Sequence, residues 1–282
     1  MKSQNPFFRF ENADSPLGFD IPDVSMFGML RITAENQPDT YAYEYFGTKC
    51  TYRELMNKIE KVSASYAAAG VKKGDIVTIV MPNTPEAVIS IYALNRIGAV
   101  SNILHPLSAQ EEIKNHINRV NSTVLLAVNI CMEKIANIID GTKLRTVIVA
   151  TPGNSMPFIM KKLYALKCIK DFKYDKKDKR YISWNDFVKK SKLVKEYIPT
   201  GKQNKETAVI LHSGGTTGTP KDIMLSNSNF NAFGIQAVLT LRDVHAEDKI
   251  LAILPVNEKR RRRQSQNPCL PWRRVSPLSV HA

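Results

Sequence analysis

The order of apolar and polar positions predicts alternating strands and helices in the middle of the chain. Runs rich in β-branched residues predict four strands, at residues 75–81, 99–104, 123–128 and 145–150. Apolar positions three or four residues apart predict three helices between or beside them, at residues 84–97, 108–119 and 131–139. Such alternation with short loops is typical of a parallel sheet covered on both faces. The expected fold class is therefore α/β, with a mainly parallel sheet and helices on both faces.

A smaller group of elements precedes this alternation. Residues 26–36 have a helical pattern. Aromatic residues alternate with other residues from Tyr41 to Phe46, and Gly47 allows a turn before the chain returns, which predicts a short hairpin. A longer helical pattern then covers residues 52–69.

Two pairs of residues predict where helices begin. Thr51 and Glu54 have the spacing of a capping box, and Gly70 is placed to end the helix that they open. Ser108 and Glu111 have the same spacing. We therefore expect Ser108 to cap the helix at 108–119 with its side chain.

A lysine-rich stretch interrupts the alternation after residue 150. Residues 161–205 hold fifteen Lys and Arg against five acids. Within and just before it, residues 157–170 form an amphipathic pattern of apolar and lysine positions. Two interpretations are open: a surface helix whose apolar stripe covers the domain, which we prefer, or a basic amphipathic helix that lies on an anionic membrane. A further helix is expected at 183–194.

The last ordered pattern is a strand at 207–211, a glycine-rich turn, a helix at 226–241 and a strand at 249–254. Beyond Val256 no periodic apolar face remains, so we expect residues 257–282 to be a disordered basic tail. The expected organisation is one partial domain at 1–256, with 155–205 as its lysine-rich part, followed by that tail.

Composition and charge exclude several classes of protein. The 43% hydrophobic content excludes wholesale disorder. The net charge is +14, but the tail contributes +6, from seven basic residues and one acid, so the remaining +8 is weak support for nucleic-acid binding. We find neither an apolar run of membrane-spanning length nor a secretory signal. The four scattered cysteines predict neither disulfides nor a zinc site, and we expect a cytoplasmic protein.

The residues between Leu211 and Asp222 have the composition of a phosphate-binding loop. Three glycines let successive backbone N–H groups converge on an anion, three hydroxyls can bind phosphate oxygens or a phosphate-bound Mg²⁺, and one lysine adds a positive charge. These residues are Ser213, Gly214, Gly215, Thr216, Thr217, Gly218 and Lys221. The loop is not that of the common ATPases, because Pro220 precedes the lysine and an acid follows it.

The same segment resembles a known family. Residues 214–221 are similar to the phosphate loop of the adenylate-forming acyl-activating enzymes, which include acyl-CoA synthetases. Residues 51–55 and 94–100 resemble two weaker signatures of that family. The resemblance covers roughly residues 25–256, least well in 155–205, and implies an incomplete N-terminal domain of such an enzyme.

The resemblance implies a two-step reaction. A carboxylate attacks the α-phosphorus of ATP, held with Mg²⁺, and the thiol of CoA then displaces AMP from the acyl-adenylate. It also implies that the seven loop residues named above bind the ATP phosphates. The amino-acid sequence of residues 212–215 and 225–230 is similar to that of long-chain fatty acyl-CoA ligases, which implies a fatty-acid substrate. Peripheral contact with the inner face of a membrane through 157–170 would suit that substrate, and no specific nucleic-acid partner is expected.

The chain departs from the family pattern at two places. Asp222 stands where the family has glycine; we expect its carboxylate to point outward into solvent, the alternative being that it faces and repels the ligand. After Pro255 the pattern is lost within a motif. In the family, the adenine-binding segment, the metal-holding glutamate and the adenylation lysine lie further along. A basic arm and a natural end are possible accounts of the tail, and we prefer a change of reading frame after codon 256.

The remaining candidates are histidines. His105 and His116 are expected to be structural, and His245 to lie in a solvated turn. The spacing shows neither a complete catalytic set nor a set of metal ligands. We therefore expect part of an ATP-dependent acid–CoA ligase that is inactive in this form. The alternative is a basic interaction module that binds nucleic acid or an anionic membrane.

Overall fold

The computed structural model describes residues 21–167, 177–193, 204–213, 221–240, 250–251 and 279–280. The strands are β1 Tyr41–Tyr45, β2 Thr48–Thr51, β3 Ile76–Val80, β4 Val100–Leu104, β5 Val124–Val128, β6 Thr146–Ala150, β7 Tyr181–Ser183, β8 Thr207–Ser213, β9 Lys221–Ser226, β10 Ile250–Leu251 and β11 Ser279–Val280. The α-helices are α1 Met26–Asn36, α2 Tyr52–Ala68, α3 Pro85–Arg96, α4 Gln110–Arg119, α5 Met132–Ile138, α6 Phe158–Lys167, α7 Trp184–Lys189 and α8 Asn227–Thr240. Single 3₁₀ turns are η1 Asn129–Cys131, η2 Ile139–Gly141, η3 Pro152–Asn154 and η4 Lys190–Leu193.

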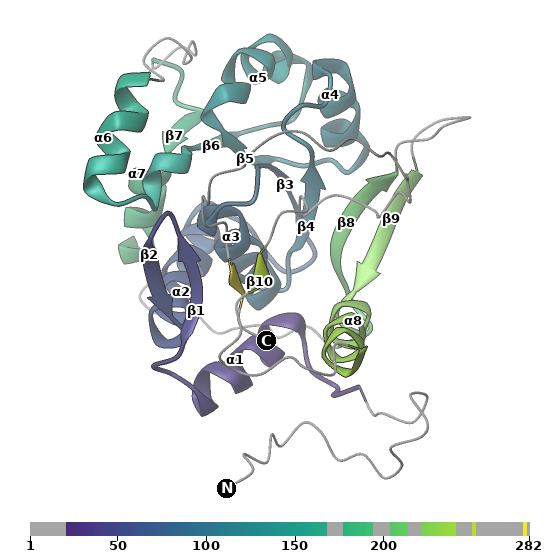
Figure 1. The fold of residues 1–282 in the computed structure, drawn as a ribbon. Helices are drawn as coiled ribbons and strands as arrows, with labels where there is room; N and C mark the ends of the chain where they lie inside the picture. Colours follow the sequence, from purple (N-terminus) through teal and green to yellow (C-terminus); the bar gives the residue numbers. More distant parts are fainter. Residues whose placement is uncertain are drawn as a thin grey trace, which may run out of the picture.

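Seven strands form the central sheet, in the order β7-β6-β5-β3-β4-β8-β9. Every neighbouring pair is parallel except β8 and β9, so one antiparallel strand closes one edge. Helices α4 and α5 lie on one side of the sheet, and α2 and α3 lie on the other (Figure 1). The expectation of an α/β fold with a mainly parallel sheet is confirmed. The hairpin of β1 and β2 stands apart from this sheet.

The predicted helix ends are correct at two places and wrong at one. The Thr51 and Glu54 capping box opens α2, and Gly70, with a φ of 84°, follows its end. Ser108, however, does not cap α4: the N-cap is Ala109, and no side chain bonds to the first turn. The N–H of Ser108 is used in a turn, where it donates to the carbonyl of His105, and the chain enters the helix only one residue later.

Three strands were not predicted. Strand β7 has only three residues, too few for a pattern to show. No element is predicted for residues 222–225, between the glycine-rich loop and the helix expected from 226, but their pairing with β8 makes β9 a full strand. Ser279–Val280 lie in the tail that we expected to be disordered, yet they form β11 by antiparallel pairing with β10. The rest of 257–282 lies outside the described residues, so the disordered tail stays a prediction.

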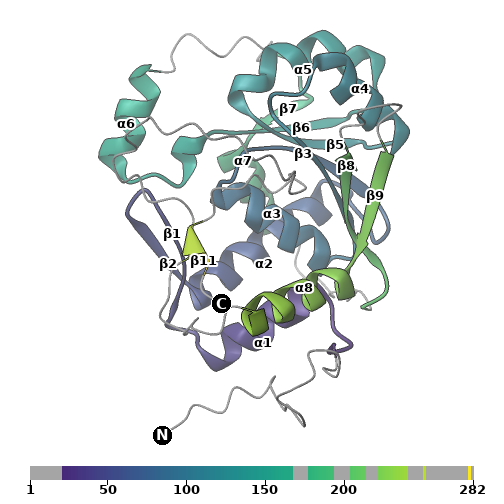
Figure 2. The same cartoon turned by 45° about the vertical axis from the view of Figure 1, so that its right-hand side comes forward.

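Helix α1 packs against the last described helix of the domain. Helix α8 lies alongside α1 (Figure 2). Asn227, the first residue of α8, accepts hydrogen bonds at its Oδ1 from the backbone N–H of Met26 and from the side chain of Asn95. The Oδ1 of Asn95 accepts in turn from the N–H of Phe27. Two buried amides therefore join α1, α3 and α8.

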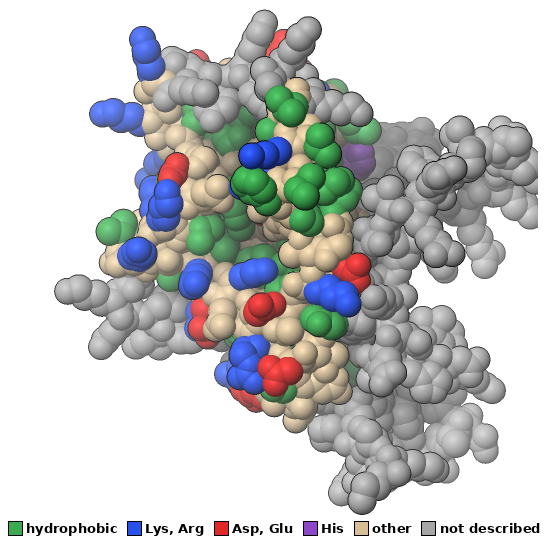
Figure 3. All heavy atoms as spheres, turned by 60° about the vertical axis from the view of Figure 1, so that its left-hand side comes forward, with side chains coloured by type: hydrophobic (Ala, Val, Ile, Leu, Met, Phe, Trp, Pro, Cys, Tyr) green, Lys and Arg blue, Asp and Glu red, His purple; other side chains and the backbone are tan. Residues whose placement is uncertain are grey.

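The lysine-rich helix α6 is placed differently from our preferred expectation. Its apolar side chains do not cover the domain: Phe158, Ile159 and Leu166 are each about 70% exposed. The face that carries α6 shows hydrophobic side chains gathered with basic ones (Figure 3). Tyr164 is the partly buried residue, and its ring lies against Gly153 of η3, where a Cβ would stand 3.2 Å from the ring. The helix is thus anchored by one aromatic ring while its apolar stripe faces outward.

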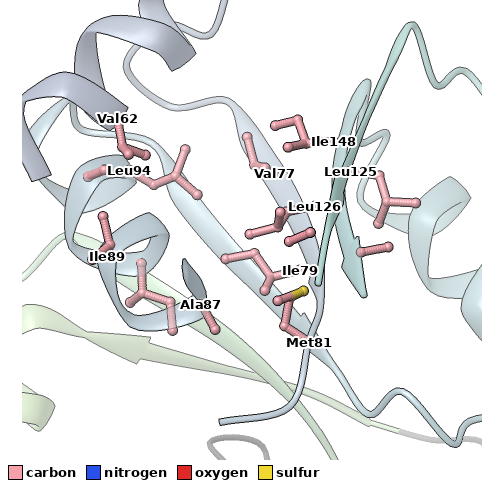
Figure 4. Close-up of a cluster of buried hydrophobic side chains, with 14 of the residues drawn as sticks. Val62, Val77, Ile79, Met81, Ala87, Ile89, Leu94, Leu125, Leu126 and Ile148 are labelled. Carbon is pink, nitrogen blue, oxygen red and sulfur yellow. The ribbon is translucent and has the colours of Figure 1, made fainter. Parts of the chain in front are cut away.

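The core lies on both faces of the sheet. Side chains of α2 and α3, among them Val62 and Leu94, face those of β3, such as Val77 and Ile79 (Figure 4). All five residues of β5 are buried. Because successive side chains of a strand point to opposite faces, β5 is covered on both sides. None of the described helices has the length and apolar character that a membrane crossing requires.

Candidate functional site

The candidate phosphate loop joins two paired strands at the edge of the sheet. Ser213, the last residue of β8, is the cross-strand partner of Lys221, the first residue of β9. Gly214, Gly215, Thr216, Thr217 and Gly218 lie outside the described residues. The structure thus brings the two ends of the loop together. Phosphate binding by the glycines and threonines of the loop stays a prediction.

The position of β8 places this loop where ligands bind in sheets of this kind. Ala208, Val209 and Ile210 are buried, and Ile210 pairs in parallel with Asn102 of β4. The loop follows the carboxyl end of β8, at the same edge where β4 ends. Ligands in open α/β sheets bind outside the carboxyl ends of the strands.

Asp222 does not point into solvent, and this corrects our expectation. It is the cross-strand partner of His212, so both side chains lie on the same face of the hairpin. Its Oδ1 lies 2.8 Å from Nδ1 of His212 and 3.1 Å from Nη1 of Arg119 in α4. The side chain is 25% exposed. Neighbouring residues of a strand face opposite sides, so the carboxylate lies on the face away from Lys221.

A network of hydrogen bonds fixes the His212 ring. The amide nitrogen of Asn102 donates to Oγ1 of Thr78, which turns Oδ1 of Asn102 toward His212. Nε2 of His212 lies 2.6 Å from that oxygen and donates to it. Nδ1 of the same ring is therefore directed at the carboxylate of Asp222.

His116 of α4 completes the cluster. Its side chain is 2% exposed, and its ring centroid lies 3.7 Å from that of His212. Its Nδ1 is buried without a hydrogen-bond partner and stands 3.6 Å from Oδ1 of Asp222. His116 is buried as a structural residue would be, but it belongs to a polar cluster rather than to the apolar core. We call His116, His212 and Asp222 the histidine cluster.

The other two predicted histidines are apart from this cluster. Nδ1 of His105 accepts the backbone N–H of Leu107 in the turn after β4, which agrees with a structural role. His245 lies outside the described residues.

Burial and charge set the ionisation of the cluster. Burial lowers the pKa of His212 below its usual range, although the hydrogen bond and charge of Asp222 act in the opposite direction. Burial and the neighbouring His212 lower the pKa of His116. Desolvation would raise the pKa of Asp222, but His212 and Arg119 outweigh it and the pKa is lowered. Burial thus opposes protonation of both imidazoles, while the neighbouring carboxylate of Asp222 favours it.

A cavity of about 380 Å³ lies apart from the histidine cluster. Its lining residues include Tyr43, Lys58, Glu86 and Ser155. Glu86 is almost fully buried, and burial raises its pKa. Its Oε1 accepts a hydrogen bond of 2.6 Å from Ser155, while its Oε2 has no hydrogen-bond partner.

The histidine cluster was not predicted, because its members come from α4, β8 and β9 and no spacing in the sequence connects them. One signal was available. A hairpin that closes between Ser213 and Lys221 makes His212 and Asp222 neighbours, so recognising β9 would have paired them.

Comparisons with known proteins agree on one family. A family model described as AMP-binding enzyme matches residues 30–257. The chain is 25% identical over 257 residues to a long-chain-fatty-acid–CoA ligase of Bacillus subtilis, which covers 90% of this chain and 46% of that protein. It is 27% identical over 247 residues to an acetyl-coenzyme A synthetase of Penicillium chrysogenum, covering 85% of this chain and 35% of that protein.

A solved structure agrees on the fold. The long-chain-fatty-acid-CoA ligase of Archaeoglobus fulgidus superposes with a TM-score of 0.63 at 20% identity, over 81% of this chain and 42% of that one. At this identity the likeness concerns the fold alone. In each comparison the chain spans less than half the length of its relative, and the relatives are matched in their N-terminal part.

Proposed function

Because the chain belongs to the AMP-binding enzyme family, we propose that it is the N-terminal part of an ATP-dependent acid–CoA ligase. In the proposed reaction, a carboxylate oxygen attacks the α-phosphorus of ATP and pyrophosphate leaves. The thiol of CoA then attacks the acyl carbon, and AMP leaves with the bonding electrons as the thioester forms. The matched acyl-CoA ligases and acetyl-CoA synthetases support this class of reaction.

The observation that carries the proposal is the pairing of Ser213 with Lys221 across the β8–β9 hairpin. It brings a hydroxyl residue and a lysine to the two ends of a loop that contains Gly214, Gly215 and Gly218. Backbone N–H groups of such a loop can bind phosphate oxygens, and a lysine charge can stabilise the negative charge that grows on pyrophosphate.

The residues present suit ATP with a divalent cation at this loop. Hydroxyl oxygens and phosphate oxygens are the hard ligands that Mg²⁺ prefers, and Thr216 and Thr217 carry such hydroxyls. When bound, Mg²⁺ would neutralise phosphate charge. The carboxylate of Asp222 is held by His212 and Arg119, and this pairing reduces its repulsion of the bound phosphates.

The substrate that we propose is a long-chain fatty acid, a member of the carboxylic acids on which the relatives named above act. An apolar substrate of this kind dissolves in membranes, and α6 offers an exposed apolar stripe with Lys161 and Lys162 beside it. We include in the proposal a peripheral contact of α6 with the inner face of an anionic membrane, in a protein that is otherwise cytoplasmic.

The 282-residue chain is proposed to lack turnover. It spans 46% of the length of its Bacillus subtilis relative, so its loop would act on the pyrophosphate side of the reaction alone. Losing one preorganised group costs on the order of 10²–10³ in rate. Release of pyrophosphate from ATP with CoA and a panel of fatty and aromatic acids should remain at background. Turnover by this chain would contradict the proposal of inactivity and leave the ligase assignment supported.

Calorimetry with Mg·ATP and with pyrophosphate tests the phosphate loop. Lys221→Ala should weaken binding of both ligands by at least about tenfold, as expected when a charged contact is lost. The control is Lys192→Ala, which removes the same charge from an exposed position in η4, near the opposite edge of the sheet. Equal affinity of the parent and Lys221→Ala would show that the loop is not the phosphate site.

A further inference from the structure

We propose that His116, His212 and Asp222 form a zinc-binding site at the base of the β8–β9 hairpin. The proposal does not depend on the ligase function, since none of the three residues is among the seven that we assign to phosphate binding. It concerns a different metal from the Mg²⁺ that accompanies ATP. Two imidazoles and one carboxylate are common zinc ligands, whereas Mg²⁺ prefers an all-oxygen set.

The ligand atoms are spaced as a metal requires. Nδ1 of His212 lies 2.8 Å from Oδ1 of Asp222, and Nδ1 of His116 lies 3.6 Å from the same oxygen. One ligand atom from each residue fits within a sphere where all separations are below 4.8 Å. Ligands at about 2.0–2.2 Å from a tetrahedral zinc ion stand roughly 3.3–3.6 Å from one another. Small side-chain rotations would bring the three atoms to that spacing.

The second observation is the unpartnered nitrogen of His116. Its Nδ1 is buried, has no hydrogen-bond partner, and faces the carboxylate of Asp222 at more than hydrogen-bond distance. A buried polar atom without a partner is rare in a folded protein and calls for a ligand or a bound ion. A cation between this nitrogen and Asp222 would supply the missing interaction.

Hydrogen bonds orient the His212 ring for this role, and a carboxylate lies near the His116 ring. Asn102 holds Nε2 of His212 as a donor, which leaves Nδ1 as the nitrogen that faces the cluster. Nε2 of His116 is directed at Oε1 of Glu112, one helical turn away, at 4.0 Å. Metal-bound histidines typically donate their other N–H to an amide or a carboxylate, which fixes the ring and raises its basicity.

The positive charge of Arg119 opposes the binding of a cation at this cluster. Its Nη1 lies 3.1 Å from Oδ1 of Asp222, the oxygen that a metal would need. Asp222 has a second oxygen to which the guanidinium can move, and the carboxylate of Glu112 adds a negative charge on the other side. The arginine therefore weakens the site without filling it. Removal of Arg119 should therefore strengthen zinc binding, an effect that is not expected if the cluster has a structural role alone.

Zinc at this place would join three elements. His116 comes from α4, His212 from β8 and Asp222 from β9, so a bound ion would fix the hairpin to the helix beside it. Three protein ligands leave a fourth position for water or another small ligand. An ion that binds the folded chain alone raises its thermal stability in proportion to the logarithm of its concentration.

The test is titration of the full chain with Zn²⁺ by calorimetry and with Co²⁺ by visible absorption. We expect one equivalent of metal and a tetrahedral cobalt spectrum without a thiolate charge-transfer band. His116→Gln and Asp222→Asn should each reduce affinity at least about tenfold. Asp222→Asn is the safer variant for folding, because Asp222 is partly exposed on an edge strand. Arg119→Gln should increase affinity.

The matched control is His105→Gln, which removes a histidine outside the cluster and should leave affinity unchanged. Zinc should also raise the melting temperature of the parent and of His105→Gln, and at the same zinc concentration it should raise that of Asp222→Asn less. The proposal is overturned if the parent binds no metal at equimolar concentration. It is also overturned if Asp222→Asn binds as well as the parent, or if the cobalt spectrum shows thiolate ligands.

Discussion

The side-chain amide of Asn95 donates a 2.7 Å hydrogen bond to the Oδ1 of Asn227, and both residues are at most 1% exposed. Asn95 lies near the end of α3, and Asn227 begins α8. Each amide oxygen also accepts a backbone N–H from the first turn of α1. These bonds satisfy N–H groups that an α-helix cannot satisfy by itself at its start.

Asn95→Ala should therefore destabilise the chain. The change removes one hydrogen-bond partner from the N–H of Phe27 and one from the amide oxygen of Asn227. We expect it to lower the free energy of unfolding by about 1–3 kcal/mol. Urea denaturation of the parent, both single variants and the double variant with Asn227→Ala gives the coupling energy. We expect about 0.5–3 kcal/mol of coupling. Strictly additive losses would show that the two amides act independently.

Thr51→Ala and Ser108→Ala form a matched pair, because both residues have the sequence spacing of a capping box and the structure uses the first alone. Thr51→Ala should lose about 1 kcal/mol of stability, since the N–H of Glu54 loses the oxygen that it donates to. Ser108→Ala should stay within about 0.5 kcal/mol of the parent. Equal losses in chemical denaturation would contradict the assigned start of α4.

Glu86 predicts a pH dependence with a definite sign. Burial raises its pKa in the folded chain, so between the ordinary glutamate pKa of about 4.3 and that raised pKa the folded state holds a proton that the unfolded state has released. Its contribution to stability is then complete at low pH and falls as the pH rises toward the folded-state pKa. Glu86→Gln, which keeps an acceptor for Ser155, should be more stable than the parent at pH 7, with the advantage shrinking toward pH 4.

Glu133→Gln is the control for that measurement, because it removes an exposed carboxylate from the first turn of α5. Thermal denaturation between pH 4 and 8 compares the three chains. A difference between parent and Glu86→Gln that does not change with pH would refute the assigned ionisation of Glu86.

Helix α6 should bind anionic vesicles if its outward stripe contacts a membrane. Leu163 and Leu166 are 57% and 68% exposed, and replacing both with glutamate puts negative charge where apolar contact is needed. In cosedimentation with phosphatidylserine-containing vesicles, the parent should bind and the double variant should not. Leu193→Glu changes an equally exposed leucine in η4 and should bind as the parent does. Binding that the double variant retains would exclude this surface.

Sequence reasoning succeeded where a single element carries its own signal. The β-branched runs gave β3 to β6, because parallel strands buried on both faces are mostly apolar, although β3 and β4 also carry the buried polar residues Thr78, Ser101 and Asn102. Thr51 and Gly70 marked the ends of α2 because a capping oxygen and a positive φ are local requirements. The predicted helix start at Ser108 was wrong, because the N–H of Ser108 bonds within the preceding turn and α4 begins after Ala109.

The direction of the Asp222 side chain and the histidine cluster depend on pairing between elements, which no local pattern contains. Asp222 faces His212 because the hairpin register makes them partners. His116 reaches them because α4 packs beside β8 and β9. For α6, the alternation of apolar and basic residues was visible, but it could not tell whether the apolar face meets the domain or the surroundings.

The contacts of α1 also set an order of events during synthesis. The N–H of Met26 bonds to a residue 201 positions later, and Asn231 donates to the carbonyl of Val24 across 207 positions. At about 5–20 residues per second, a ribosome needs roughly 10–40 s to make the intervening chain. During that interval α1 can pack against α2 and α3, which are made earlier, but not against α8. Newly made chains thus present to chaperones the part of α1 that α8 covers, until α8 emerges and completes this unit.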